Sequence, residues 1–151
     1  MNIEGVIPPI STPFENGEPA LDKLVQNIQK WNETALSGYL VLGSNGEGVY
    51  LTETEKLAVV RKARETIPDS KFMIVGTGLE STRETIRLTN LMAESGADYG
   101  LVSPPFYFKN SMQEKILADH FQAVAEASRM PILLYNVPQF TGINLTPSLV
   151  S

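Results

Sequence analysis

Short apolar segments of strand length recur along this chain at a nearly even spacing. They begin near residues 5, 38, 71, 99 and 132, so the steps between them are about 33, 33, 28 and 33 residues. Segments that are apolar almost throughout are typical of parallel strands buried on both faces of a sheet. Crossovers of this length are expected to be right-handed. The repeat leaves two architectures: a doubly wound open sheet, or part of a (β/α)8 barrel.

The intervals between these segments carry helix signals. Apolar residues recur with the period of a helix face between residues 20 and 34. Thr52 and Glu55 have the spacing of a capping box, in which each side chain bonds the backbone amide of the other residue. The helix that they open is expected to run to about Thr66. The same spacing recurs at two other predicted helix starts: Ser81 with Glu84, and Ser111 with Glu114.

A loop of functional appearance follows each predicted strand. These loops contain Thr12-Pro13, Ser44-Asn45, Thr77-Gly78, Phe106-Tyr107 and Asn136. Barrel enzymes place their active sites at the carboxyl ends of the strands, so this distribution favours the barrel. A complete barrel takes about 250 residues. We therefore expect residues 1–151 to be the N-terminal portion of a single TIM-barrel domain, with roughly the first five strands and four helices.

The loop from Gly43 to Gly48 is too rich in glycine for a regular element. A nucleotide-binding loop is one interpretation, but the glycine spacing differs from the dinucleotide fingerprint and no Walker lysine is present. A tight turn without a ligand is another. A small carboxylate bound by the backbone amides of Ser44 and Asn45 fits better, because bare amides at the carboxyl edge of a sheet bind small anions.

Two tyrosines stand in the strand-end loops. Tyr135 ends the last apolar segment, where a tyrosine more often packs than catalyses. In a barrel its phenol would point into the mouth near Ser44, where a chain of hydroxyls passes protons. Tyr107 has the same two interpretations. His120, in the middle of a predicted helix, is expected to be a packing or surface residue.

Charge and residue types exclude several classes of site. A formal net charge of −5 argues against nucleic acid or an anionic membrane as partner. With no cysteine and one histidine, the chain offers neither a thiolate nor a histidine zinc site, and we expect no metal and no cofactor. No apolar run approaches the roughly 20 residues of a membrane span. We expect a cytoplasmic protein.

The loop motifs follow one another in a distinctive order. They are Thr12-Pro13-Phe14, Gly43-Ser44-Asn45-Gly46-Glu47, Gly76-Thr77-Gly78, Phe106-Tyr107, and Tyr135-Asn136-Val137-Pro138 with Thr141-Gly142. This order resembles the dihydrodipicolinate synthase/N-acetylneuraminate lyase family over the whole chain. The Gly-Ser-Asn-Gly-Glu variant is particularly similar to its 4-hydroxy-2-oxoglutarate aldolase branch. The resemblance implies a (β/α)8 barrel and a lyase, a class I aldolase that makes or breaks a carbon–carbon bond through a Schiff base with pyruvate or another 2-oxo acid.

The resemblance also implies roles for individual residues. The amides of Ser44 and Asn45 bind the carboxylate of the 2-oxo acid, and Tyr135 is the general acid/base. The Ser44 hydroxyl relays the proton of Tyr135. Tyr107 continues this relay, in the family often into the site of a neighbouring subunit, which implies a homo-oligomer. Two further residues of the catalytic face are expected to contribute to substrate binding: Thr12 and Gly78.

The chain departs from the family pattern at two points. Phe140 stands where dihydrodipicolinate synthases carry an arginine that binds a second carboxylate, so we expect an aldolase for another 2-oxo acid. The Schiff-base lysine of the family lies one βα repeat after Tyr135, roughly at position 163, and thus beyond Ser151. Among the lysines present, only Lys109 is expected on the catalytic face. The chain alone is therefore expected to be inactive. The alternative is a non-catalytic partial barrel that binds a 2-oxo acid or serves in assembly.

Overall fold

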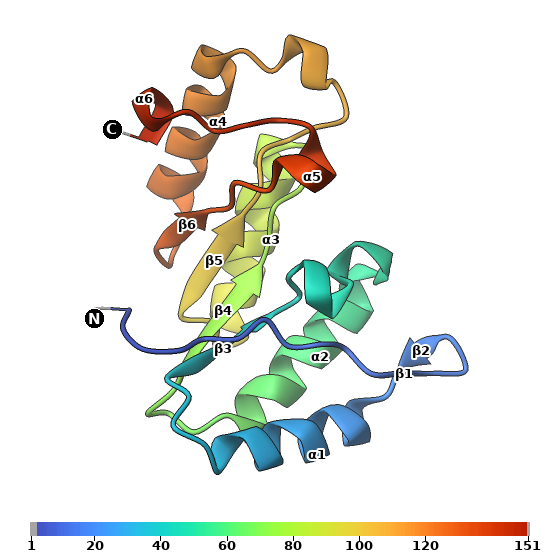
Figure 1. Ribbon diagram of the computed structural model, residues 1–151. Helices are drawn as coiled ribbons and strands as arrows, with labels where there is room; N and C mark the ends of the chain where they lie inside the picture. Colours follow the sequence, from blue (N-terminus) through green and yellow to red (C-terminus); the bar gives the residue numbers. More distant parts are fainter. Residues whose placement is uncertain (1–2, 151) are drawn as a thin grey trace.

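The computed structural model describes residues 3–150 and contains one main sheet (Figure 1). Its parallel strands stand in the order β3-β4-β5-β6, which is also their order along the chain. They are β3 (Gly38–Val41), β4 (Phe72–Gly76), β5 (Tyr99–Val102) and β6 (Ile132–Leu134). A doubly wound sheet reverses its order at a switch point, whereas a barrel wall adds each strand beside the last. The observed order is that of a barrel wall.

Helices occupy each crossover between these strands. The helix α2 (Glu53–Thr66) joins β3 to β4, α3 (Thr82–Glu94) joins β4 to β5, and α4 (Glu114–Ala127) joins β5 to β6. The helix α1 (Leu21–Asn32) precedes β3 and packs beside α2. The short elements are β1 (Phe14–Glu15), β2 (Glu18–Pro19), α5 (Pro138–Thr141), α6 (Pro147–Val150) and the 3₁₀ helices η1 (Ser44–Gly46), η2 (Gly48–Tyr50) and η3 (Lys109–Ser111).

Alternate residues of the strands face the helices and form the core. The helix-facing residues of β3 and β4 are at most 1% exposed and pack with apolar residues of α1, α2 and α3: Tyr39, Val41, Met73 and Val75. Val102 of β5 belongs to a second cluster with residues of α4. The other face of the sheet is covered less completely, with these leucines half-buried: Leu40, Leu101 and Leu133. The helices therefore cover one face, and the opposite face has the position of a barrel interior.

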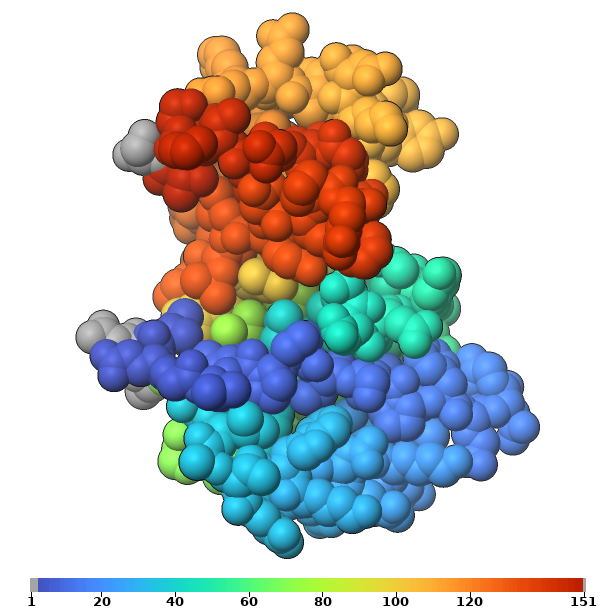
Figure 2. All heavy atoms as spheres, viewed as in Figure 1, coloured from blue at the N-terminus to red at the C-terminus, as the bar shows by residue number. Residues whose placement is uncertain are grey.

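The first predicted strand, near residues 5–11, is not a regular strand, so that part of the prediction is wrong. The segment is extended, runs across the face of the molecule seen in Figure 2 (dark blue), and forms a single parallel bridge, between Pro9 and Leu40. Leu40 donates its amide to the Pro8 carbonyl at 2.9 Å, and the Ile10 amide donates to the Leu40 carbonyl at 3.0 Å. Pro8 and Pro9 have no amide hydrogen, so the segment lies beside β3 without a full ladder. The wall thus has four strands and an extended flanking segment in place of five strands.

The three predicted capping boxes have three different outcomes. At the start of α2 the box is complete: the Thr52 amide donates to Glu55 Oε2 at 2.7 Å, and the Glu55 amide donates to Thr52 Oγ1 at 3.3 Å. At the start of α3, Ser81 accepts the Glu84 amide at 3.4 Å, but Glu84 turns to arginines instead. The third box, at Ser111 and Glu114, is wrong. The residue that precedes α4 is Gln113, which makes no side-chain capping bond, and Ser111 ends η3.

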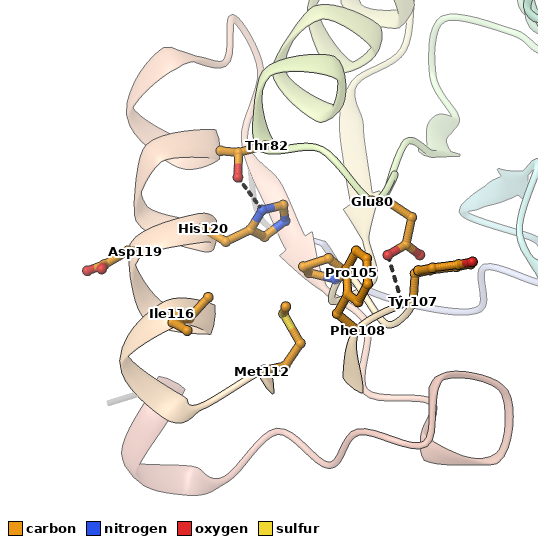
Figure 3. Close-up of a pocket in the computed structure, with 9 residues that line it drawn as sticks. All are labelled: Glu80, Thr82, Pro105, Tyr107, Phe108, Met112, Ile116, Asp119 and His120. Atoms are coloured by element: carbon orange, nitrogen blue, oxygen red, sulfur yellow. Dashed lines mark hydrogen bonds between the residues drawn. The ribbon is translucent and has the colours of Figure 1, made fainter. Parts of the chain in front are cut away.

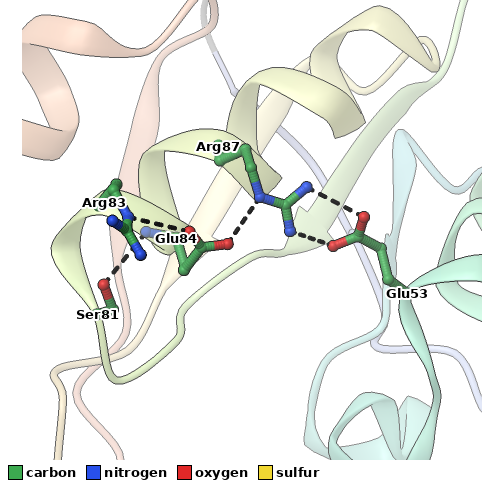
Figure 4. A network of polar contacts seen from close by, with 5 residues as sticks. All are labelled: Glu53, Ser81, Arg83, Glu84 and Arg87. Atoms are coloured by element: carbon green, nitrogen blue, oxygen red, sulfur yellow. Dashed lines mark hydrogen bonds and ion pairs between the residues drawn. The ribbon is translucent and has the colours of Figure 1, made fainter.

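Arg87 connects the amino-terminal turns of α2 and α3 (Figure 4). Its guanidinium donates from Nε to Glu84 Oε2 at 2.7 Å and from Nη1 to Glu53 Oε1 at 3.0 Å, and Nη2 also contacts Glu53. The hydrogen bond from Arg87 lowers the pKa of the Glu53 carboxyl. Arg87 thereby links α2, which follows the Ser44 loop, to α3, which follows the Thr77 loop.

We predict that Thr52→Ala lowers the free energy of unfolding by about 1 kcal/mol, because α2 loses a cap that bonds its backbone. Ser111→Ala is the matched control. It removes the hydroxyl of the predicted box that does not form, so it should change stability by less than about 0.5 kcal/mol. Urea denaturation of both variants measures the difference, and equal losses would contradict the assignment of the caps.

We also predict that residues 1–151, expressed alone, self-associate. Within the described residues the sheet has two open edges, the extended segment beside β3 and the outer side of β6, and open edges template further pairing. The half-buried leucines of the inner face add exposed apolar area. Light scattering on the purified chain tests this. A monodisperse monomer with a cooperative melt would show that the sheet is closed in some other way.

Candidate active site

Ser44 and Tyr135 are brought together although 91 residues separate them. The Ser44 hydroxyl lies 3.2 Å from the Tyr135 hydroxyl, within hydrogen-bonding distance. Ser44 follows β3 and Tyr135 follows β6, which are three strand spacings apart in the sheet. In a flat sheet their backbones would be about 14 Å apart. The contact shows that the sheet curves as a barrel wall does, with its carboxyl ends converging.

The turn after β3 leaves backbone amides available. The amides of Gly46 and Glu47 bond back within the turn, to Gly43 and Ser44 at 3.0 and 3.2 Å. Within residues 3–150 no such bond is found for the amides of Ser44 or Asn45. Two non-glycine residues flank this turn in the left-handed region, Leu42 with φ 57° and Glu47 with φ 52°. Such conformations are costly and occur often at functional sites.

Thr12, which follows the extended N-terminal segment, bonds to this turn. Its hydroxyl donates to the Gly46 carbonyl at 2.7 Å, and the side chain is 6% exposed. This bond places Thr12 behind the loop, where it fixes the turn that carries Ser44. Its predicted contact with substrate stays a prediction.

Gly78 lies where the ends of β4 and β5 approach each other. A Cβ on Gly78 would lie 2.6 Å from both the amide nitrogen and the hydroxyl of Ser103. Gly78 and Ser103 both line the cavity described next. Glycine is therefore required here for close approach of two loops, and its predicted role in substrate binding stays a prediction.

Ser44 and Tyr135 line a cavity of about 770 Å³ at the carboxyl end of the sheet. Its wall includes Leu42, Leu101, Val137 and other apolar residues, with Ser44 and Tyr135 among the polar ones. Phe140 is 62% exposed and lines the same cavity. The volume is within the range of pockets that hold small molecules.

Tyr107 lies outside this cavity. It is 76% exposed, and its ring makes an edge contact with Phe108 at a centroid distance of 4.9 Å. The Glu80 carboxylate accepts the amides of Phe106 and Tyr107 at 2.9 and 2.8 Å, which fixes the loop but not the phenol. Within the described part of the chain, Tyr107 thus does not extend the Ser44–Tyr135 pair, and its relay role stays a prediction.

Lys56 and Glu80 are cavity residues that sequence reasoning missed. The sequence predicts only Lys109, among the lysines present, on the catalytic face, but Lys56 stands in the first turn of α2 and lines the cavity. Burial lowers the pKa of its ammonium group, while the nearby Glu53 acts in the opposite direction. The position of a residue in the first turn after a strand-end loop is the signal that would have found Lys56.

Two types of feature are absent from residues 3–150. These residues contain no group of three or more histidine, cysteine, aspartate or glutamate side chains arranged to hold a metal ion. No helix in this range is long and apolar enough to cross a membrane.

Sequence comparison agrees with the geometry. The sequence pattern of the Dihydrodipicolinate synthetase family matches residues 2–151. The chain belongs to this family. It is 39% identical to the 4-hydroxy-tetrahydrodipicolinate synthase of Methanothrix thermoacetophila, over 97% of the chain and 49% of that protein. It is 38% identical to the probable mitochondrial 4-hydroxy-2-oxoglutarate aldolase of Emericella nidulans, over 87% of the chain and 44% of that protein.

Solved structures of the family confirm the predicted fold class. A crystal structure of a dihydrodipicolinate synthase (dapA) superposes with a TM-score of 0.92 at 37% identity, over 98% of this chain and 51% of that one. YagE, a prophage protein of the family from E. coli K12 solved in complex with pyruvate, gives 0.89 at 34% identity, over 97% and 49%. The chain spans about half the length of these relatives and supplies about half of a (β/α)8 barrel.

We predict that Gly78→Ala lowers the free energy of unfolding by about 1–3 kcal/mol, because the methyl group would overlap the Ser103 backbone. Gly43→Ala is the control: the three atoms nearest to its methyl group would all belong to the Leu40 side chain, the closest at 3.1 Å, and that side chain is able to move. Chemical denaturation of both variants measures the difference. A loss at Gly43 as large as that at Gly78 would contradict the close approach of the two loops.

Proposed function

We propose that this chain provides the 2-oxo acid half of the active site of a class I pyruvate-dependent aldolase. The observation that carries the proposal is the 3.2 Å contact between the hydroxyls of Ser44 and Tyr135 at the cavity. The free amides of Ser44 and Asn45 bind the carboxylate of pyruvate or another 2-oxo acid, since amide donors pair well with carboxylate oxygens. A relative solved with pyruvate bound supports this class of ligand.

In this proposal Tyr135 is the general acid/base. A phenol hydroxyl both donates and accepts hydrogen bonds, so Tyr135 is able to give its proton to a developing alkoxide and to take it back. The Ser44 hydroxyl both accepts and donates, and therefore relays the proton that Tyr135 gives or takes. Tyr107 extends the relay from a neighbouring copy in a homo-oligomer, and its 76% exposure leaves it free to reach another subunit.

The residue at position 140 of the cavity wall favours a substrate that has no second carboxylate near it. Phe140 presents an exposed ring there, and an aromatic ring does not bind a carboxylate. We therefore favour an aldolase for another 2-oxo acid over the synthase reaction. The name of the Emericella nidulans relative, a 4-hydroxy-2-oxoglutarate aldolase, supports this choice. A cytoplasmic enzyme remains our expectation.

The covalent step is not assigned to any lysine of this chain. Lys56 lines the cavity, and Lys109 lies against Gly142. Neither stands on a strand of the sheet, where the resemblance places the amine that forms the Schiff base. The second candidate is a non-catalytic partial barrel that binds a 2-oxo acid in the same cavity or serves in assembly.

We predict that borohydride reduction of the chain with pyruvate leaves its mass unchanged. Trapping needs an imine, and the imine needs an unprotonated amine placed at the pyruvate carbonyl. Intact mass spectrometry is the measurement, with a pyruvate-dependent aldolase of full length as the positive control. A stable pyruvyl adduct on Lys56 or Lys109 would overturn this prediction.

We predict that Tyr135→Phe lowers turnover by roughly 10²–10⁴-fold in an active barrel and changes KM little, because the phenol acts on protons in the transition state. The test protein is a fusion of this chain with the C-terminal half of the Emericella nidulans relative. Phe140→Leu serves as the control, since it keeps an apolar wall. Unchanged turnover in the Tyr135 variant would remove this residue from the mechanism.

A further inference from the structure

A second cavity lies on the other side of the Tyr107 loop, between that loop, the start of α3 and α4 (Figure 3). Its volume is about 450 Å³, and Glu80 is the one lining residue that it shares with the catalytic cavity. Pockets of this size hold small molecules. Of the residues that line this cavity, the function proposed above uses only Tyr107.

His120 provides the polar group of this cavity. The side chain is 3% exposed and projects from α4 toward Pro105 (Figure 3). Its Nδ1 lies 2.9 Å from the Thr82 hydroxyl, and its Nε2 is buried without a hydrogen-bond partner among residues 3–150. Burial also lowers the pKa of the imidazole, so the neutral form predominates at neutral pH. Buried polar atoms nearly always have a partner, and Nε2 is therefore a group that needs one.

The two carboxylates of the wall already have partners, and the Tyr107 phenol, which also lines it, belongs to a side chain that is 76% exposed. Glu80 accepts two backbone amides of the loop, and Asp119 pairs with Lys115 at 2.7 Å. Figure 3 shows Asp119 directed away from the cavity. The rest of the wall is apolar or aromatic and includes Pro105, Phe108, Met112 and Ile116. An occupant thus meets a mostly apolar surface beside His120, whose buried Nε2 is unsatisfied within residues 3–150.

We propose that this cavity binds a small uncharged molecule with an apolar ring and one hydroxyl group, of which phenol is the simplest. A hydroxyl both donates and accepts, so it satisfies Nε2 in either tautomer of His120. The ring contacts Met112 and Ile116 and packs against the edge or face of Phe108. A charged ligand is disfavoured because both nearby carboxylates are already paired and no cationic group lines the wall.

The test uses the fact that His120 is the only histidine of the sequence. The ring nitrogens of His120 therefore give unambiguous ¹⁵N signals. Phenol is titrated into the ¹⁵N-labelled chain, and toluene, which lacks the hydroxyl, is titrated in parallel. We expect a saturable shift of Nε2 with phenol and binding of toluene that is several-fold to about tenfold weaker, the value of one hydrogen bond.

Two variants locate the binding. Ile116→Trp fills the mouth of the cavity and should abolish the saturable shift, since Ile116 is 45% exposed and lines it. Val49→Trp, at an 84% exposed position of the catalytic cavity, is the matched control and should leave phenol binding unchanged. If Ile116→Trp disturbs the fold, His120→Phe replaces it. Because this variant has lost the imidazole signals, binding is followed through the backbone amides of Phe108 and Met112, and phenol should bind no better than toluene.

The proposal is overturned by a shift that grows linearly without saturation or by no shift at all, which would mean that water alone meets Nε2. It is also overturned if phenol binding survives Ile116→Trp, or if His120→Phe keeps the preference for phenol over toluene. The 2-oxo acid site is untouched by any of these results, because pyruvate binding is measured separately.

Discussion

The curvature of the parallel sheet is the constraint on which the candidate site depends. Without it, Ser44 and Tyr135 would stand at the ends of strands about 14 Å apart, and neither hydroxyl would influence the other. With it, they lie 3.2 Å apart beside the amides of Ser44 and Asn45, which have no partner within residues 3–150. In the function proposed above, the amides bind a carboxylate and Tyr135 donates a proton, so the pairing of these two roles depends on the curvature of the wall.

Close backbone approach at the carboxyl ends makes this convergence possible. A Cβ on Gly76 would lie 2.2 Å from the Leu42 carbonyl oxygen, so β4 ends directly against the turn that follows β3. Leu42 itself adopts a left-handed conformation there although its side chain is buried. Burial of the Leu42 side chain offsets the free-energy cost of this backbone conformation. The left-handed turn at Leu42 directs the chain from β3 into η1. Packing and site geometry are therefore coupled at this point.

The sequence predicted the features that depend on neighbouring residues, such as helix ends and caps. It did not predict the features that depend on contacts between residues far apart in the chain. The start of β4 near residue 71, the end of α2 at about Thr66 and the complete capping box at Thr52 follow from periodicity and capping patterns, and all three are confirmed. The segment near Pro8 and Pro9 was predicted from its apolar character, but missing amide donors prevent a full ladder. The surroundings of Lys56 and the unpaired nitrogen of His120 depend on loops folded from elsewhere, which no local pattern specifies.

The most direct test of a 2-oxo acid site is a titration of the ¹⁵N-labelled chain with pyruvate, followed through its backbone amides. Binding of the carboxylate at the turn after β3 predicts saturable shifts that are largest at the amides of Ser44 and Asn45. Propanone, which has the ketone but no carboxylate, should leave both amides unchanged. Saturable shifts centred elsewhere, or none at these two amides, would contradict the assignment of this turn as the carboxylate site.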